Sequence, residues 1–181
     1  MAKATVRTHS APAVSTVARP LIHQVALWGL AALLFFPPFF RGLFFPPEQY
    51  RALAWAAVLF WMVFYGRWVN REQKVFAHPL DYLMLALPAV YLYSAFFAVN
   101  TGLAVNEVVK ATLYFLVFWT TVRLVRGEDE ANFVITVIYL SAIGVALAGL
   151  ATATGIIHIK DGFLNGRIYS SYQYPNALAA L

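Results

Sequence analysis

The most constraining feature of this sequence is a series of apolar runs of about twenty residues, separated by short polar or proline-rich segments. An α-helix rises about 1.5 Å per residue, so each run is long enough to cross the ~30 Å hydrocarbon core of a bilayer. Hydrophobic residues make up 61% of the 181-residue chain and charged residues 12%, against roughly half and a quarter in soluble domains. A soluble all-helical core is the alternative, but a chain of this length cannot bury so many uncharged runs inside itself. The sequence therefore predicts an integral membrane protein.

The runs predict an all-α, polytopic transmembrane helix bundle with about five complete spans and the start of another. The spans are expected at about residues 21–36, 49–66, 80–98, 104–122 and 131–153, with the sixth opening at Asn176. Residues 1–19 are small, polar and basic, which predicts a flexible tail, and residues 20–181 then form the N-terminal part of one multi-pass domain. Because no Ala-x-Ala cleavage site follows the first apolar run, that run is expected to be a retained anchor.

Two copies of Phe-Phe-Pro-Pro, beginning at Phe35 and Phe44, follow the first span. Proline lacks a backbone N–H and clashes with the preceding turn, so neither proline pair is expected inside a helix. The phenylalanines favour the membrane surface, and the segment is expected to form an aromatic interfacial hairpin. Pro46 and Pro47 would lead into the second helix, with Glu48 near its positive end.

Basic residues set the predicted orientation. With the N-terminus in the cytoplasm, that side holds eight basic residues and the other side five, which agrees with the positive-inside rule. The cytoplasmic set is Lys3, Arg7, Arg19, Arg67, Arg71, Lys74, Arg123 and Arg126, and the outer set is Arg41, Arg51, Lys110, Lys160 and Arg167. The net charge of +5 is therefore interpreted as a topology signal, and no nucleic-acid partner is expected.

Several kinds of chemistry are excluded by what the sequence lacks. The absence of cysteine excludes disulfides, Cys–zinc sites and thiol nucleophiles. The sequence contains no Gly-rich phosphate loop, no HExxH and no GxSxG motif. We therefore expect no metal and no cofactor.

Arg167 is the leading candidate for a binding residue, since it lies among tyrosines, serines and a glutamine in the predicted last outer loop. A planar guanidinium suits phosphate and pyrophosphate oxygens. An arginine in an interfacial aromatic belt is the alternative, and spacing alone favours that reading. Asn176, after Pro175, is a good helix N-cap, and the helix N-terminus that it caps is also an anion site.

Weaker candidates lie near the second and fourth spans. Glu107 and Lys110 are three residues apart and are expected to pair, and snorkelling accounts for Lys110. Arg41, between the two Phe-Phe-Pro-Pro copies, reaches either lipid headgroups or an outer cavity. Asp81 is expected to stabilise the start of the third span. A solvated cytoplasmic turn is expected to contain Arg123, Arg126, Glu128, Asp129 and Glu130.

The order of motifs in this chain resembles the O-antigen ligase/polymerase family. In that family an arginine is followed by a short Ser/Gly-Phe/Tyr segment, then Pro-Asn, then a helix rich in alanine and leucine. Arg41-Gly42 in an aromatic loop, HPLD at 78–81 and YLYSAFFAVN at 91–100 are also similar, so the resemblance covers roughly residues 20–181. The residues that carry the main motif here are Arg167, Ser170, Ser171, Tyr174, Pro175 and Asn176.

The resemblance implies a glycosyltransferase of the inner membrane, with this chain as half of a GT-C-like fold. Such enzymes take a glycan from an undecaprenyl-pyrophosphate carrier on the outer leaflet and pass it to a lipid, glycan or protein acceptor. Arg167 would then hold the pyrophosphate, with Tyr174 and Asn176 beside it and Arg41 and Lys110 as weaker helpers. The large outer loop of the family, which carries its key histidine, is absent here. This implies an N-terminal fragment that is inactive alone, and it leaves the catalytic residues unknown.

A membrane transporter, or a subunit associated with transport, is the alternative function, because a bicarbonate-transport role has been attached to similar sequences. Transporters place polar residues near the membrane midplane, often at broken helices. Here Pro88 is the only clear break within a predicted span, and no charge is predicted at mid-depth, which favours the glycosyltransferase. A scaffold subunit is a third class, in which Arg167 would be dispensable.

Overall fold

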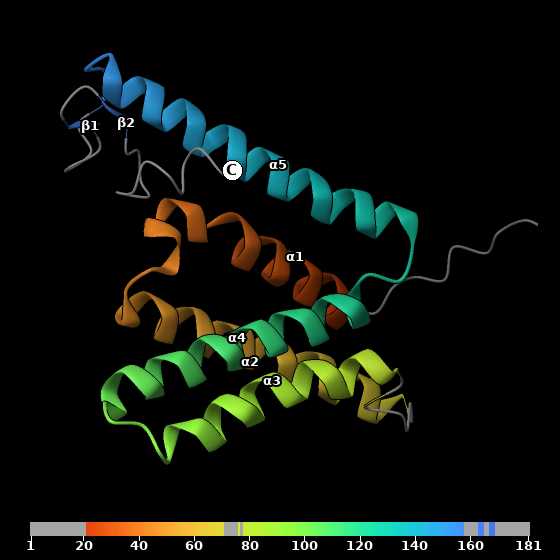
Figure 1. The fold of residues 1–181 in the computed structure, drawn as a ribbon. Coiled ribbons are helices and arrows are strands. Elements are labelled where there is room, and N and C mark those ends of the chain that lie inside the picture. Colours follow the sequence, from red (N-terminus) through yellow and green to blue (C-terminus); the bar gives the residue numbers. More distant parts are fainter. Residues whose placement is uncertain (1–20, 71–75, 77, 158–162, 165–166, 169–181) are drawn as a thin grey trace, which may run out of the picture.

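A computed structural model describes residues 21–70, 76, 78–157, 163–164 and 167–168. Within those residues the chain is helical apart from one very short hairpin, and its long helices run up and down (Figure 1). The elements are α1 (Leu21–Phe35), η1 (Pro37–Phe39), η2 (Arg41–Leu43), α2 (Pro46–Val69), α3 (Pro79–Ala95), α4 (Thr101–Leu124), α5 (Glu128–Ala153), β1 (Phe163–Leu164) and β2 (Arg167–Ile168).

Four helical segments in the described part of the chain are long and apolar enough to span a membrane, and they identify it as a membrane protein. They are Leu21–Phe39, Pro46–Val69, Thr101–Leu124 and Glu128–Ala153. The prediction of a helical transmembrane protein is confirmed at this level. The helix α3 has 17 residues and is not among these four segments, so the count of five spans stays a prediction.

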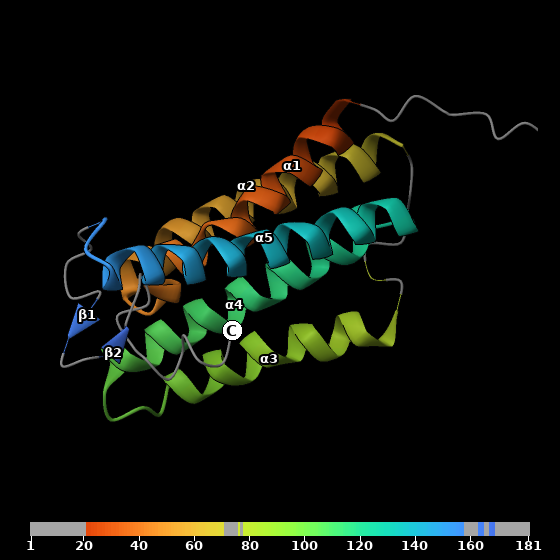
Figure 2. The ribbon, with the colours of Figure 1, turned by 90° about the horizontal axis from the view of Figure 1, so that it is seen from above.

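The core lies where α1, α2 and α4 pack against one another. Trp119 of α4 and Leu30 of α1 are fully buried there, and the ring centres of Trp119 and Phe60 are 4.6 Å apart. The helix α5 packs against α1, and α3 packs against α4. Figures 1 and 2 both show α3 at an edge of the bundle, and Asp81 is its single buried residue.

The corner between α1 and α2 agrees with what its prolines predicted. Pro37 and Pro38 lie in the 3₁₀ turn η1, after α1 has ended. Pro46 and Pro47 occupy the first turn of α2, where no backbone N–H is needed, and Glu48 follows in the same turn. The prolines thus end one long helix and begin the next.

A left-handed segment completes this corner. Arg41, Gly42 and Leu43 have φ angles of 52°, 62° and 58°. This conformation costs a residue with a side chain roughly 1–2 kcal/mol, so the surrounding structure must support it. Gln49, which is buried in α2, gives that support through its Nε2, which donates to the carbonyl oxygens of Leu43 and Phe44 at 2.9 and 3.2 Å.

The bundle therefore has two distinct ends (Figure 1). The Phe-Pro end holds η1 and η2, the start of α2, the start of α4 and the end of α5. The hairpin β1–β2 packs against α5 and lies at this end as well. The Arg123 end holds the starts of α1, α3 and α5 and the ends of α2 and α4.

Candidate functional site

The structure places three of the predicted binding residues at the Phe-Pro end. Arg41 lies in η2, Lys110 lies in the first half of α4, and the described part of Arg167 is its backbone in β2. The strand β2 pairs antiparallel with β1. Tyr174 and Asn176, and with them the predicted sixth span, lie outside the described residues.

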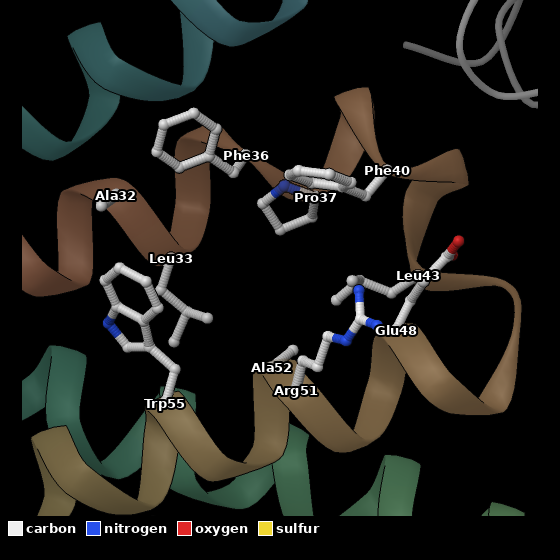
Figure 3. A pocket seen from close by; sticks show the side chains of 10 residues that line it. All are labelled: Ala32, Leu33, Phe36, Pro37, Phe40, Leu43, Glu48, Arg51, Ala52 and Trp55. Carbon is white, nitrogen blue, oxygen red and sulfur yellow. The ribbon is translucent and has the colours of Figure 1, made fainter.

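A cavity of about 170 Å³ lies at this end, between the proline-rich corner and the first turns of α2. Phe36, Pro37 and Phe40 form one wall, and Trp55 and Arg51 project from α2 on the other side (Figure 3). Most of the remaining lining is aliphatic. The cavity thus offers aromatic rings, on which a sugar can stack, and the Arg51 guanidinium, which can bind an anion.

Glu48 is the acidic residue of the cavity lining. Its Oε1 lies 3.9 Å from Nε of Arg41, and its side chain is 18% exposed. Its Oε2 is buried and has no hydrogen-bond partner among the described residues. An unsatisfied buried oxygen is costly, so a hydrogen-bond donor that reached this atom would lower the free energy of the site.

Arg41 lies beside the cavity rather than on its wall. Its guanidinium is 5.0 Å from the ring centre of Phe45, a cation–π distance, and it approaches Glu48 from the same side. The side chain is 44% exposed. Arg41 thus lies near the cavity without lining it, and the choice between lipid headgroups and an outer cavity stays a prediction.

Lys110 pairs with Glu107, as predicted from their spacing. Nearby, the hydroxyl of Tyr50 donates to Oδ1 of Asn106 at 2.8 Å, which ties the start of α2 to α4. Lys110 does not line the cavity. Lys110 thus lies in the half of α4 that is nearer to the Phe-Pro end, but it is not on the cavity wall.

Arg51 is a site residue that sequence reasoning missed. It was counted only as an outer basic residue, yet it lines the cavity together with Glu48. The two are three residues apart on α2, so they share one helix face. That spacing, directly after the second Phe-Phe-Pro-Pro copy, was the signal that could have identified the pair.

At the Arg123 end, the expectation of a solvated turn is wrong for Arg123 and Glu130, which are 5% and 3% exposed. The Nη1 and Nη2 atoms of Arg123 donate to the two carboxylate oxygens of Asp81 at 2.8 and 2.6 Å. The Arg123 guanidinium also lies 4.4 Å from the ring centre of Trp119. Arg123 is buried because tertiary packing places the Asp81 carboxylate of α3 against the last turn of α4.

Two further contacts fix this end. One oxygen of Glu130 accepts from the backbone N–H of Arg126 at 2.6 Å, and the other lies 2.9 Å from Nε2 of His23, which links α5 to α1. Asp81 also accepts from the backbone N–H of His78 at 3.1 Å. The predicted role of Asp81 at the start of its helix is thus confirmed, and its pairing with Arg123 adds to that role.

Comparison of the chain with protein-family models, with curated proteins and with solved structures gave no match. Within the described residues, no three His, Asp or Glu side chains come together in a way that could hold a metal ion.

Proposed function

We propose that this chain is part of a membrane glycosyltransferase of the O-antigen ligase type. It would transfer a glycan from an undecaprenyl-pyrophosphate carrier to a lipid, glycan or protein acceptor at the outer face of the cytoplasmic membrane. One observation carries the proposal: an aromatic cavity with Arg51 and Glu48 on its lining lies at the end of the bundle that also bears Arg41 and the Arg167 strand. The motif RIYSSYQYPN supplies the link to this class of enzyme.

The chemistry explains why cations would gather there. In glycan transfer, the bond between the anomeric carbon and the carrier pyrophosphate breaks, and the pyrophosphate leaves with the electron pair. Preorganised cations stabilise the negative charge that develops on it. Arg167 is the proposed pyrophosphate ligand, because a guanidinium can bind two oxygens at once. Arg51 and Arg41 add positive charge at the same end, and Lys110 is a weaker helper.

Glu48 is our candidate for the proton acceptor. As the acceptor oxygen forms its bond to the anomeric carbon, its proton must pass to a base. A general base has to lie within hydrogen-bond reach of that hydroxyl. The buried Oε2 of Glu48, which lacks a hydrogen-bond partner among the described residues, supports this role.

The finer topology belongs to the same proposal. We infer five spans with the N-terminus in the cytoplasm, forming half of a GT-C-like fold. The 17 residues of α3 reach the lower limit of the roughly 17–25 residues that a span requires. Because successive helices alternate in direction, the Phe-Pro end and the hairpin lie on one side of the bundle, the side with fewer basic residues in the sequence. The positive-inside rule supports an outer location for that side.

Glycan transfer by the full-length protein tests the proposal. We would compare the wild type with Arg167→Ala and Arg167→Lys at matched expression, and with Arg71→Gln as a control that removes one positive charge from a predicted cytoplasmic loop. Both Arg167 variants should lose about 100-fold or more of the transfer rate, because lysine cannot reproduce a bidentate contact. Normal transfer by both variants would refute the role of Arg167 and favour a transporter or a scaffold.

The same assay tests Glu48. Glu48→Gln should slow transfer by roughly 10²- to 10⁴-fold, the usual contribution of a general base. Glu107→Gln is the matched control, since it removes a carboxylate at the same end of the bundle, and its rate should stay near that of the wild type. Undiminished transfer by Glu48→Gln would remove Glu48 as the base and leave the Arg167 test unaffected. Purified residues 1–181 alone should transfer no glycan.

A further inference from the structure

A second set of polar side chains lies toward the Phe-Pro end, on α4 and outside the cavity. Asn106, Glu107 and Lys110 belong to the first half of the helix, and we call them the polar face of α4. Lys110 is four residues after Asn106 and three after Glu107, so the three share one side of the helix. Tyr50 of α2 adjoins this face, because its hydroxyl donates to Oδ1 of Asn106 at 2.8 Å. None of these four residues lines the cavity.

The polar face lies inside the part of α4 that would cross a membrane. The helix has 24 residues and is one of the segments that are long and apolar enough to span. At about 1.5 Å per residue it is about 36 Å long, roughly 6 Å longer than the hydrocarbon core. Lys110 comes nine residues, or about 14 Å, after Thr101 at the start of the helix. Even if all the excess length lay at the Phe-Pro end, the backbone of Lys110 would be about 8 Å inside the hydrocarbon core.

This face is open in part, and some of its hydrogen-bonding groups are available. The side chains of Glu107 and Lys110 are 48% and 32% exposed, and they pair with each other. The second carboxylate oxygen of Glu107 and the amide nitrogen of Asn106 have no hydrogen-bond partner among the described residues. Polar groups therefore lie exposed on α4 at membrane depth.

A lipid environment does not suit these groups. Charged and amide side chains are costly in hydrocarbon, and within membrane helices they face the bundle interior or water. Snorkelling explains a lone lysine at this depth. The ammonium of Lys110, however, stops at Glu107, one turn nearer to the start of the helix. Snorkelling does not explain the shorter side chains of Glu107 and Asn106, so the face requires a polar environment.

We propose that the polar face of α4 lines an aqueous path that enters the membrane domain from the Phe-Pro end. Water satisfies hydrogen-bonding groups nearly as well as a direct partner, so it supplies what the described residues do not. Tyr114, four residues after Lys110, continues the same side of the helix toward the middle of the membrane and is 58% exposed. The path admits hydrophilic molecules, and its existence does not depend on glycan transfer.

Cysteine labelling tests this path, because residues 1–181 contain no cysteine. We would introduce Tyr114→Cys or, as the matched control, Val58→Cys of α2 into the full-length protein, with the unsubstituted protein as the background. The two residues come thirteen and twelve residues after the starts of their helices and are 58% and 60% exposed. In membrane fragments that are open on both sides, the cationic methanethiosulfonate reagent MTSET should label Tyr114→Cys at least about tenfold faster than Val58→Cys. The reagent attacks the thiolate, which forms where the thiol meets water.

A second measurement asks whether Lys110 lies beside the path. In the Tyr114→Cys protein, Lys110→Gln should raise the ratio of labelling by MTSET to labelling by its anionic counterpart MTSES at least about threefold. The reason is that a positive charge near the entering reagent is lost. Arg71→Gln, which removes a positive charge from a predicted cytoplasmic loop, should leave the ratio unchanged.

Two results would overturn the proposal. The first is labelling of Tyr114→Cys as slow as that of Val58→Cys, which would place the face against lipid or against another protein surface. The second is an unchanged ratio of the two reagents in the Lys110→Gln protein, which would show that Lys110 does not line the path. If Tyr114→Cys does not reach the membrane in a folded form, Lys110→Cys takes its place, and labelling as slow as that of Val58→Cys would then refute the path.

Discussion

The two ends of the bundle use charged side chains in opposite ways. At the Arg123 end, Arg123 pairs with Asp81, which lies 42 residues away in the sequence, and both are buried. At the Phe-Pro end, Lys110 pairs with Glu107, three residues away, and both are partly exposed. The first pair joins two helices, whereas the second stays on one helix and joins nothing.

This difference distinguishes charged side chains that stabilise the folded state from charged side chains that are available to bind a ligand. Removing one member of a buried pair leaves the other member uncompensated, so such a pair resists rearrangement. A partly exposed local pair contributes little to stability and can reorganise around a ligand at small cost. Glu48 and Arg41 form a loose, partly exposed contact of the second kind, and Arg51 is exposed, which is a physical reason to place the chemistry at the Phe-Pro end.

The largest effect is expected from Asp81→Asn. Asparagine keeps an oxygen that can accept from the backbone N–H of His78, and it removes the negative charge and one of the two oxygens to which Arg123 donates. The variant should lose about 3–5 kcal/mol of unfolding free energy, because Arg123 would remain buried without a carboxylate. Denaturant titration in mixed micelles measures this, with Glu107→Gln as the control. A loss under about 1 kcal/mol would show that the pair does not hold α3 to α4, and the contrast between the ends would fail.

A medium effect is expected from Gly144→Ala, which tests how firmly the Phe-Pro corner is anchored. A Cβ at Gly144 of α5 would lie 2.9 Å from Cζ of Phe39 in η1, and Phe39 is itself stacked on Phe35. We expect a loss of about 1–3 kcal/mol of unfolding free energy from this overpacking.

Gly66→Ala in α2 is the matched control for that variant. The nearest heavy atom to its added Cβ is Cγ2 of Ile22 at 3.9 Å, an ordinary contact. Alanine favours a helix over glycine, so this variant should gain up to about 1 kcal/mol. If Gly144→Ala is as stable as Gly66→Ala, Phe39 moves easily and η1 is not anchored on α5.

The sequence predicted what depends on neighbouring residues and missed what depends on packing. Apolar runs and proline pairs act locally, so the helices and the proline corner could be anticipated. The spans are apolar on every side, however, and therefore carry no pattern that marks an inward face. Nothing local shows that Asp81 meets Arg123 or that Glu48 opens into a cavity. Arg123 was assigned to a turn because the fourth span was expected to end at about residue 122, whereas α4 continues to Leu124 and keeps Arg123 inside the bundle.

The smallest effect, and the sharpest test of the contrast, is expected for Glu107 and Lys110. Each glutamine substitution should change the unfolding free energy by less than about 1 kcal/mol, and a double-mutant cycle should give a coupling of roughly 0.3–0.5 kcal/mol. Exchanging the two residues should cost a few tenths of a kcal/mol, because an acid on the N-terminal side of a base is the favoured order in a helix. A coupling above about 2 kcal/mol would mean that the bilayer desolvates this pair, and it would then belong with Asp81 and Arg123. If Lys110→Gln keeps the stability of the wild type but slows glycan transfer, Lys110 acts in ligand binding and not in stabilising the fold. That result would agree with the contrast between the two ends.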